Sequence, residues 1–410
     1  MNVQLSFSSE AFSGAVKVTG SKSESNRLLI LQALFPQIKL ANLSNSDDTR
    51  VLQSALASKE EVIDIHHAGT AMRFLTAYFA TKEGREVVLT GSERMQERPV
   101  KILVEALRQL GADIQYLKNE GFPPLKIVGQ KLQKSEVTVQ SNISSQYISA
   151  LMLIAPSLPH GLQINLDGKV TSVPYIEMTL RFLSDCGING SFENDRIVIE
   201  PAGNIPQKEV LIESDWSSAS YFYSLVALSE EATVTISSYK EDSYQGDQVV
   251  AGIYKQLGVQ TIYENDILHL KKCDFKRPRN LVLDLSNSPD LAQTIAVTCL
   301  GLGIKCDLTG LHTLRIKETD RLQALKTEIE KLGGQVDITA DSLHLIPVEN
   351  LKAGIKIATY KDHRMALAFA PLALKVPLEI EEAEVVSKSF PGFWNDLENL
   401  GFSVINISKG

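Results

Sequence analysis

The chain has 410 residues, which is too long for one ordinary hydrophobic core and therefore predicts two domains. Its composition, 44% hydrophobic and 22% charged residues, is typical of a globular protein, and its net charge of -8 argues against a polyanionic partner such as nucleic acid. The four cysteines form no CxxC pair, no apolar run reaches the roughly 18 residues of a membrane span, and the first residues carry no targeting pattern, so we expect a cytoplasmic protein without a metal site.

The first predicted elements are an alternating strand over Ala15–Thr19 and an apolar helix over Leu28–Leu34, joined by the segment 20–27, GSKSESNR. Serine hydroxyls and backbone N–H groups at such a helix start can bind an oxyanion, which Lys22 and Arg27 would neutralise. The segment is not a P-loop, because no glycine directly precedes the lysine. An ordinary serine cap with two solvated cations explains the same residues, so the segment alone leaves both interpretations open.

Two further segments, AGTAMR at 68–73 and RMQERP at 94–99, place glycine or arginine at a predicted helix start or loop. The glycine and threonine of the first segment would let a ligand approach the backbone closely. Arg94 and Arg98 could each bind a carboxylate or phosphate through two parallel hydrogen bonds, although pairing with the neighbouring glutamates is an equally simple interpretation.

The middle of the chain contains two more helix starts with polar side chains. The serines of SSQ at 144–146 precede a helix over Tyr147–Ile154, and a helix cap would use only one of them. Asp290 precedes an apolar helix over Leu291–Leu300, where an N-cap is the simpler interpretation of an aspartate.

The segment 315–321, RIKETDR, is predicted to open a helix. Lys317 and Arg321 would then lie four residues apart and project from one helix face, beside Glu318. Two cations at a helix N-terminus form an anion site, and a carboxylate inside it could transfer protons. A solvated, salt-bridged first turn is the alternative.

Two segments near the C-terminus complete the series: DHR at 362–364 opens a predicted helix over Met365–Leu374, and Lys388 lies in a loop. Together, these separate helix starts and loops present Lys, Arg, Ser or Thr in an otherwise acidic protein. Such a set suits a site for two anionic small molecules. No HExxH, DxDxDG or His/Cys cluster indicates a metal.

A weak internal repeat runs through the chain. Five predicted helices end near a glycine, where positive φ is needed, at intervals of 76, 71, 75 and 68 residues. The glycines are Gly111, Gly187, Gly258, Gly333 and Gly401. A strand, a polar turn and a second strand follow four of them, which predicts a repeated α/β unit. The first unit, with its helix over Asp47–Ala57, is short, because only Ser58–Ile65 separate that helix from the next segment.

Over nearly its full length, the chain resembles the 5-enolpyruvylshikimate-3-phosphate synthase family. The motifs that carry the resemblance are GSKSESNR at 20–27, AGTAMR at 68–73, RMQERP at 94–99, SSQ at 144–146, SVPY at 172–175, SPD at 288–290, RIKETDR at 315–321, DHRMA at 362–366 and KSFP at 388–391. The resemblance implies an α/β fold of two hinged domains, each of three βαβαββ units, between which the chain crosses twice. We place residues 1–20 and 246–410 in one domain, and residues 21–245, with the shortened first unit, in the other.

The resemblance also implies a reaction of the shikimate pathway. The enolpyruvyl group of phosphoenolpyruvate would pass to the 5-hydroxyl of shikimate 3-phosphate, with release of phosphate from a tetrahedral intermediate. Asp290 would take the hydroxyl proton, Glu318 would deliver a proton to the methylene carbon, and Lys22 would also be catalytic. The residues implied for shikimate 3-phosphate are Lys22, Ser23, Arg27, Ser144, Ser145, Gln146, Ser172, Tyr175, Asp290 and Lys317. Those implied for phosphoenolpyruvate are Lys22, Gly69, Arg94, Gln146, Arg321, Arg364 and Lys388.

No cofactor is implied, and the expected partners are the two small-molecule substrates, without nucleic acid or membrane, bound by a monomer. Glyphosate would compete with phosphoenolpyruvate for the same cations. Three positions depart from the family's usual residues: His67 and Thr313 stand where asparagine is common, and Phe74 stands where proline is common.

Two other functions compete with this one. The related enolpyruvyl transferase that acts on UDP-N-acetylglucosamine usually carries a cysteine in a mobile loop, whereas Cys186 ends a predicted helix here. The SSQ and RIKETDR motifs also favour shikimate 3-phosphate. A non-catalytic clamp of α/β repeats around DNA would need a basic face, which the net charge of -8 opposes.

Overall fold

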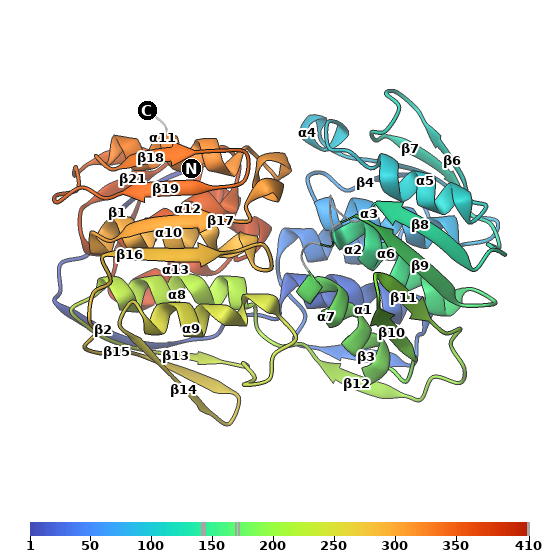
Figure 1. The fold of residues 1–410 in the computed structure, drawn as a ribbon, viewed down its shortest axis with the longest axis horizontal. Coiled ribbons are helices and arrows are strands. Elements are labelled where there is room, and N and C mark those ends of the chain that lie inside the picture. Colours follow the sequence, from blue (N-terminus) through green and yellow to red (C-terminus); the bar gives the residue numbers. More distant parts are fainter. Residues whose placement is uncertain (141–144, 169, 171–172, 408–410) are drawn as a thin grey trace. The chain divides into compact units, whose positions relative to one another are not determined.

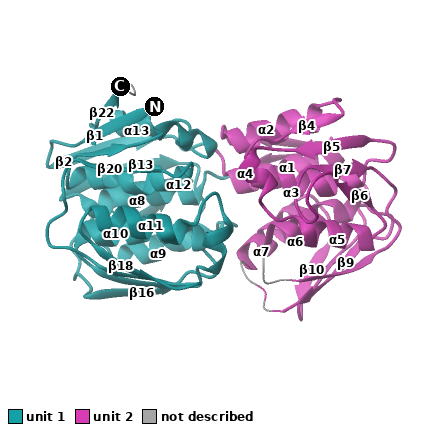
Figure 2. Cartoon of the chain, turned by 90° about the horizontal axis from the view of Figure 1, so that it is seen from above, with its two compact units in different colours: residues 1–19, 213–410 teal, residues 20–212 magenta. Residues whose placement is uncertain are grey.

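The structure is a computed structural model that describes residues 1–140, 145–168, 170 and 173–407. The chain forms two compact units: unit 1 comprises residues 1–19 and 213–410, and unit 2 comprises residues 20–212 (Figure 2). The second crossing therefore lies between Ile212 and Glu213, whereas the sequence placed it after residue 245.

Strand pairing explains this difference. The elements concerned are α8 (Trp216–Leu228), β13 (Glu231–Ser237), β2 (Ala11–Val16) and β15 (Ile267–Lys272). β13 pairs in parallel with β2 and antiparallel with β15, so it belongs to a sheet of unit 1. The polar turn 243–246 indicated a boundary, but it lies inside unit 1, where the Ser243 hydroxyl donates to Glu213 at 2.6 Å.

Three sheets follow one βαβαββ path, in which two parallel strands and a helix precede a second helix and an antiparallel hairpin. The first, with strand order β4-β5-β7-β6, contains β4 (Val62–Asp64), α3 (Gly69–Ala80), β5 (Glu86–Thr90), α5 (Lys101–Gln109), β6 (Asp113–Tyr116) and β7 (Leu125–Val128). The second contains β8 (Glu136–Gln140), α6 (Ser145–Ile154), β9 (Leu162–Asp167), α7 (Val173–Asp185), β10 (Gly190–Glu193) and β11 (Arg196–Ile199). The third, in unit 1, contains β16 (Asn280–Asp284), α10 (Ala292–Leu302), β17 (Lys305–Thr309), α11 (Arg321–Lys331), β18 (Gln335–Ile338) and β19 (Leu343–Ile346).

Two more sheets of unit 1 each use a strand from the N-terminus. β2 is the edge strand of the sheet β14-β15-β13-β2, and β1 (Asn2–Ser6) lies inside the sheet β20-β21-β1-β22. The other elements of these two repeats are α9 (Val250–Lys255), β14 (Val259–Glu264), β20 (Ile355–Ile357), α12 (His363–Phe369), β21 (Leu378–Ile380), α13 (Phe393–Asn399) and β22 (Ser403–Ile407). Both repeats are thus completed by residues that lie far apart in the sequence.

The first repeat of unit 2 is short, as predicted. It contains α1 (Lys22–Leu34), β3 (Ile38–Ala41), α2 (Asp47–Ala57) and β12 (Lys208–Leu211). β3 and β12 form a parallel sheet of two strands. The chain passes from α2 directly to β4, which already pairs with β5 of the next repeat. The predicted α/β fold of repeated βαβαββ units with a truncated first unit is confirmed.

The glycines predicted to end helices support the repeat. All five have positive φ, between 79° and 104°. A residue without Cβ adopts this conformation without strain, so each glycine permits the turn from helix to strand.

Each unit contains a group of central helices, one from each repeat. These are α1, α3 and α6 in unit 2, and α8, α10 and α12 in unit 1, which Figure 1 shows with the strands around them. α8 and α10 are apolar on nearly all sides and almost entirely buried, as expected of core helices. Hydroxyl pairs join these two helices: Ser220 with Thr294 at 3.2 Å and Ser224 with Thr298 at 2.7 Å. Within the described ranges, no helix is both long and apolar enough to cross a membrane.

Candidate active site

The N-terminal ends of α10 and α12 carry a carboxylate between two arginines. Asp290 lies in the 3-10 turn Pro289–Leu291 that precedes α10. Its Oδ1 accepts a hydrogen bond from Arg321 at 2.8 Å, and its Oδ2 accepts one from Arg364 at 3.0 Å. Lys317 Nζ lies 3.9 Å from Oδ1. The carboxylate therefore faces a cluster of cations, and the simpler interpretation of Asp290 as the N-cap of α10 is wrong.

Arg321 joins three carboxylates and is only 2% exposed. Its Nε donates to Asp362 at 2.7 Å, and its two terminal nitrogens donate to Asp290 and to Glu318, each at 2.8 Å. Lys388 Nζ binds the other oxygen of Glu318 at 2.7 Å. The network, which we call the Asp290 cluster, consists of Asp290, Lys317, Glu318, Arg321, Asp362, Arg364 and Lys388.

The charges of this cluster hold one another ionised. Burial alone would raise the pKa of Asp290, but the positive charges of Arg364, Lys317 and Arg321 lower it below its ordinary value. Burial would lower the pKa of Arg321, whereas the neighbouring carboxylates raise it. Asp290 is therefore ionised and Arg321 is charged at neutral pH. A carboxylate in this state is a weak base until part of the surrounding positive charge is taken up by a ligand.

The segment RIKETDR contributes Lys317, Glu318 and Arg321 to the Asp290 cluster, but the helix starts later in this segment than predicted. α11 begins at Arg321, and Asp320 is its N-cap, with a side chain that accepts from the Gln323 N–H at 3.1 Å. Lys317 and Glu318 precede the helix, so the prediction that Lys317 and Arg321 share one helix face is wrong. Both still reach Asp290, Lys317 from the connection before α11 and Arg321 from the first position of the helix.

No sequence motif predicted Asp247, which lies beside the Asp290 cluster. The Ser217 hydroxyl donates to the Asp247 carboxylate and accepts from Arg364 at 3.2 Å. Asp247 is buried, and this burial, with the negative charge of Asp290, raises its pKa to about 6. The sequence signal was the turn that contains Gln245, which was interpreted as a domain boundary. In the structure, the Gln245 amide instead binds the Trp216 N–H at 2.9 Å, at the start of α8.

In unit 2, Lys22 and Ser23 lie in the first turn of α1, which begins six residues earlier than the predicted apolar helix. Lys22 Nζ is 3.5 Å from Asp48 Oδ2. Asp48 is 3% exposed, and its Oδ1 has no hydrogen-bond partner among the described residues. The ammonium group of Lys22 therefore lies close to a buried carboxylate of the same unit.

Arg27, also on α1, is buried between two aromatic rings. Its guanidinium carbon lies 5.6 Å from the centre of the Phe74 ring and 5.5 Å from that of Tyr175. It donates to the Ser23 carbonyl, Ser149 and Thr179 at 2.9 to 3.0 Å. Burial lowers the pKa of Arg27 to about 10, with Tyr175 and Glu24 acting in the opposite direction, so the group stays charged at neutral pH.

Two of the residues predicted to bind phosphoenolpyruvate, Gly69 and Gln146, lie at the start of α3. Gly69 is the first residue of α3, and the amide of Gln146, on α6, donates to the Thr70 hydroxyl at 3.3 Å. Arg94 lies on the short helix α4 (Glu93–Gln96), where its half-exposed side chain pairs with Glu97 at 3.0 Å. Gly69 and Gln146 thus lie close together at the start of α3.

Of the remaining predicted serines, one lies in the described part of the chain and two do not. Ser145 is the buried first residue of α6, whereas the predicted residues Ser144 and Ser172 lie outside the described residues. Of the unusual positions, Phe74 is buried beneath Arg27, and His67 is exposed. Thr313 is buried, and its hydroxyl has no hydrogen-bond partner within the described chain.

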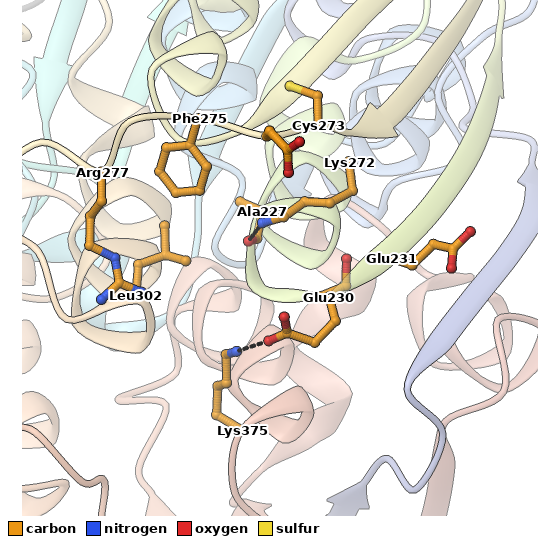
Figure 3. Close-up of a pocket in the computed structure, with 11 residues that line it drawn as sticks. Ala227, Glu230, Glu231, Lys272, Cys273, Phe275, Arg277, Leu302 and Lys375 are labelled. Atoms are coloured by element: carbon orange, nitrogen blue, oxygen red, sulfur yellow. Dashed lines mark hydrogen bonds and ion pairs between the residues drawn. The ribbon is translucent and has the colours of Figure 1, made fainter.

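A separate pocket of about 510 Å³ lies in unit 1, at the C-terminal ends of α8 and α10 (Figure 3). Its lining contains both signs of charge: Glu230, Glu231, Asp274, Lys272, Arg277 and Lys375. Lys272 is already used, since it donates to the Ala227 carbonyl at 2.5 Å, and Lys375 lies 3.6 Å from Glu230. The pocket contains no predicted site residue, and Asp290 lies at the opposite end of α10, so we assign no role to this pocket.

Comparisons with known proteins identify the family of this chain. A family model described as EPSP synthase (3-phosphoshikimate 1-carboxyvinyltransferase) matches residues 50–397. The chain belongs to the EPSP synthase family. The resemblance based on the motifs is thereby confirmed, and membership of this family does not favour the alternative that acts on UDP-N-acetylglucosamine.

Known EPSP synthases match along nearly the whole chain. A 3-phosphoshikimate 1-carboxyvinyltransferase from Bacteroides fragilis (strain YCH46) is 48% identical over 396 residues, which is 95% of each chain. One from Mannheimia haemolytica is 36% identical, covering 94% of this chain and 96% of the relative. A solved EPSP synthase structure from Acinetobacter baumannii is similar in fold, with a TM-score of 0.80 at 21% identity, over 99% of this chain and 100% of that chain.

Proposed function

We propose that the chain transfers the enolpyruvyl group of phosphoenolpyruvate to the 5-hydroxyl of shikimate 3-phosphate and releases phosphate, as a step of the shikimate pathway. The observation that carries the proposal is the Asp290 cluster, where three carboxylates, among them Asp290 and Glu318, are held among four cations. The names of the related enzymes support the choice of substrates.

The proposed binding residues are divided between the units. For phosphoenolpyruvate they are Arg321, Arg364 and Lys388 of unit 1 and Lys22, Gly69, Arg94 and Gln146 of unit 2. For shikimate 3-phosphate they are Asp290 and Lys317 of unit 1 and Lys22, Ser23, Arg27, Ser144, Ser145, Gln146, Ser172 and Tyr175 of unit 2. Cations and hydroxyls at helix starts are suited to carboxylate and phosphate groups.

The chemistry requires one base and one acid. Asp290 takes the proton of the 5-hydroxyl while the hydroxyl oxygen forms a bond to C2 of phosphoenolpyruvate, and Glu318 gives a proton to C3. The resulting tetrahedral intermediate then loses a proton from C3 to the Glu318 carboxylate, and its bond between C2 and the phosphate oxygen breaks while Asp290 gives up its proton to the leaving phosphate. This elimination restores the double bond and releases phosphate.

The electrostatics of the cluster couple this chemistry to binding. Arg364, Lys317 and Arg321 lower the pKa of Asp290 despite its burial. When an anionic substrate binds to these cations, it takes up part of their positive charge, and the pKa of Asp290 rises toward the range in which it can accept a proton. Substrate binding thus makes Asp290 a better base than it is in the free protein. Glu318 is bound to Arg321 and Lys388 in the same cluster.

The experiment that tests this function is phosphate release from phosphoenolpyruvate, measured with and without shikimate 3-phosphate. We expect release only with shikimate 3-phosphate, and none when UDP-N-acetylglucosamine replaces it. Release with the sugar nucleotide alone would support the alternative transferase instead.

The absence of a cofactor, a monomeric state, a cytoplasmic location and the lack of nucleic-acid or membrane partners remain predictions. Activity in the presence of a strong metal chelator, and a mass measurement in solution, would test the first two.

A further inference from the structure

A buried carboxylate of α11, Glu328, binds the segment that leads into α12. Glu328 is fully buried, and its Oε1 accepts a hydrogen bond from the Tyr360 hydroxyl at 2.6 Å. Its Oε2 accepts from the Ala358 N–H at 3.2 Å and from Lys331 Nζ at 2.7 Å. Residues 358–362, which we call the α12 connection, join β20 to α12, so Glu328 binds this connection at two points.

The backbone of the α12 connection is strained. Tyr360 and Lys361 are consecutive residues with positive φ, 53° and 57°. Neither is a glycine, so the Cβ of each residue crowds its own backbone, and the conformation persists only where the surrounding structure holds it. Burial and the negative charge of Glu328 raise the pKa of Tyr360 to about 12, so its hydroxyl keeps its proton and donates at neutral pH. The bond to Glu328 therefore supports the first of the two strained residues.

The other end of the α12 connection is bound by the same helix. Arg321, the first residue of α11, donates to Asp362 through Nε at 2.7 Å. Asp362 is the N-cap of α12 and accepts from the Arg364 N–H at 2.9 Å. Arg321 and Glu328 are seven residues apart on α11, which is about two helical turns, so they lie on one face of the helix. α11 thus holds the connection at both ends and sets the position of Arg364, whose guanidinium donates to Asp290.

We propose that Glu328 is a positioning residue for phosphoenolpyruvate: through the Tyr360 hydroxyl it holds the strained α12 connection and thereby places Arg364 in the substrate site. Glu328 itself touches no substrate. The inference rests on the proposed function, in which Arg364 binds phosphoenolpyruvate and is not among the residues for shikimate 3-phosphate. Loss of the support should therefore affect one substrate and not the other, whereas a purely structural role of Glu328 would lower stability without this selectivity.

The first test measures the steady-state kinetics of Tyr360→Phe, which removes one hydroxyl and keeps the ring. We expect the KM for phosphoenolpyruvate to rise about 3- to 30-fold, because the arrangement that binds this substrate is then only partly populated. The KM for shikimate 3-phosphate should stay near normal. Glu328→Gln, which keeps the size of the side chain but loses its charge, should show the same selective rise.

The matched control is Tyr116→Phe on β6 of unit 2. The Tyr116 hydroxyl has no hydrogen-bond partner within the described residues, so its removal should leave both KM values normal. Circular dichroism at the assay temperature would show that each variant is folded. A normal KM for phosphoenolpyruvate in folded Tyr360→Phe would overturn the proposal, and so would an equal rise of KM for both substrates.

The second test relieves the strain in the α12 connection. Lys361 is exposed, and glycine at this position adopts positive φ without a steric cost. In the Tyr360→Phe background, Lys361→Gly should therefore bring the KM for phosphoenolpyruvate part of the way back to its natural value, whereas alone it should change this KM little. An equal KM for Tyr360→Phe with and without Lys361→Gly would overturn the role of the strained backbone.

The same assays separate this inference from the proposed function. If the natural protein released phosphate with shikimate 3-phosphate but Tyr360→Phe kept a normal KM for phosphoenolpyruvate, only this inference would fail. Absence of release by the natural protein would instead refute the proposed function.

Discussion

At the scale of single residues, Asp290 and Glu318 are similar in type but differ in their partners. Asp290 lies among Arg321, Arg364 and Lys317, whereas Glu318 is held between Arg321 and Lys388. We expect Asp290→Asn and Glu318→Gln each to lower turnover by about 10²- to 10⁴-fold, the usual contribution of an acid or base, with a smaller change in substrate affinity.

The control for these two variants is Asp320→Asn, because Asp320 belongs to the same segment but caps α11. Asparagine is as good an N-cap as aspartate, so the turnover of Asp320→Asn should stay near normal. Steady-state kinetics would check all three proteins. Near-normal turnover of either catalytic variant would show that its carboxylate serves only to hold the cations in place.

Asp247 should make stability depend on pH. Its pKa is about 6 in the folded chain, against about 3.9 for an aspartate in an unfolded chain. The folded state therefore binds the proton more tightly, and this group's contribution to stability is present below pH 4 and is lost as the pH rises to 6. Two pKa units correspond to about 3 kcal/mol. Asp290 has a lowered pKa, so its contribution has the opposite sign and is lost as the pH falls below 4.

Asp247→Asn should remove this dependence. The free energy of unfolding of the variant, relative to the natural protein, should rise between pH 4 and pH 7. Denaturant unfolding at several pH values would measure it. A difference between the two proteins that stays constant over this range would contradict the proposed titration of Asp247.

Gly69 determines how an inhibitor that resembles phosphoenolpyruvate should respond to substitution. A methyl group at position 69 would meet the Arg98 guanidinium. Overpacking of this kind costs about 1–3 kcal/mol, so Gly69→Ala should weaken glyphosate inhibition by roughly 5- to 150-fold. Phe74, which stands where the family commonly has proline, is buried beneath Arg27. Inhibition constants for both proteins would test this, and equal constants would show that position 69 does not affect the inhibitor.

At the scale of elements, two of the glycines that end helices differ in the space around their Cα atoms. Gly258 and Gly333 both have positive φ in unit 1, but a Cβ on Gly258 would lie 2.4 Å from the Phe275 ring, whereas one on Gly333 would only touch Val348 at 3.5 Å. Alanine at positive φ costs about 1–2 kcal/mol, so Gly333→Ala should lose that amount. Gly258→Ala should lose about 1–3 kcal/mol more. Denaturant unfolding would measure both, and equal losses would mean that Phe275 moves aside freely.

The elements that the sequence predicted correctly are those with local signals. α2 has its predicted bounds, and the five helix ends were marked by glycine. The predicted start of α11 was too early, because it rested on the charges of Lys317 and Glu318. An aspartate before an apolar periodic run, here Asp320, is the stronger signal for a helix start. With Asp320 as the N-cap, the sequence predicts the observed start of α11 at Arg321.

The parts of the structure that the sequence could not predict depend on contacts between distant residues. The pairing of β13 with β2 decides where the chain crosses, and no local pattern reports it. The same holds for Asp247, which reaches the Asp290 cluster through Ser217 and Arg364. Arg94 and Arg98 belong to one motif, but Arg94 is half exposed and pairs with Glu97, whereas Arg98 is buried beside Gly69.

At the scale of the whole molecule, unit 1 depends on residues from both ends of the chain. Leu5 is fully buried in β1 and lies opposite Leu378 and Val404, whereas Gln4 is exposed in the same strand. Leu5→Ala should lower the free energy of unfolding by about 2–5 kcal/mol, and Gln4→Ala should change it by less than about 0.5 kcal/mol. Denaturant unfolding would measure both. A small loss for Leu5→Ala would show that unit 1 is stable without the packing of its N-terminal strand.

The position of β1 also sets an order of events on the ribosome. β1 is synthesised long before its neighbours β21 and β22, which begin only at Leu378 and Ser403. At about 5–20 residues per second, translation takes on the order of 20–75 s to reach them. Unit 2 comes from one uninterrupted stretch and can fold in the meantime, while β1 waits with both edges unpaired. Its polar residues Asn2, Gln4 and Ser6 alternate with apolar ones, which lowers the tendency of the waiting strand to pair with other nascent chains.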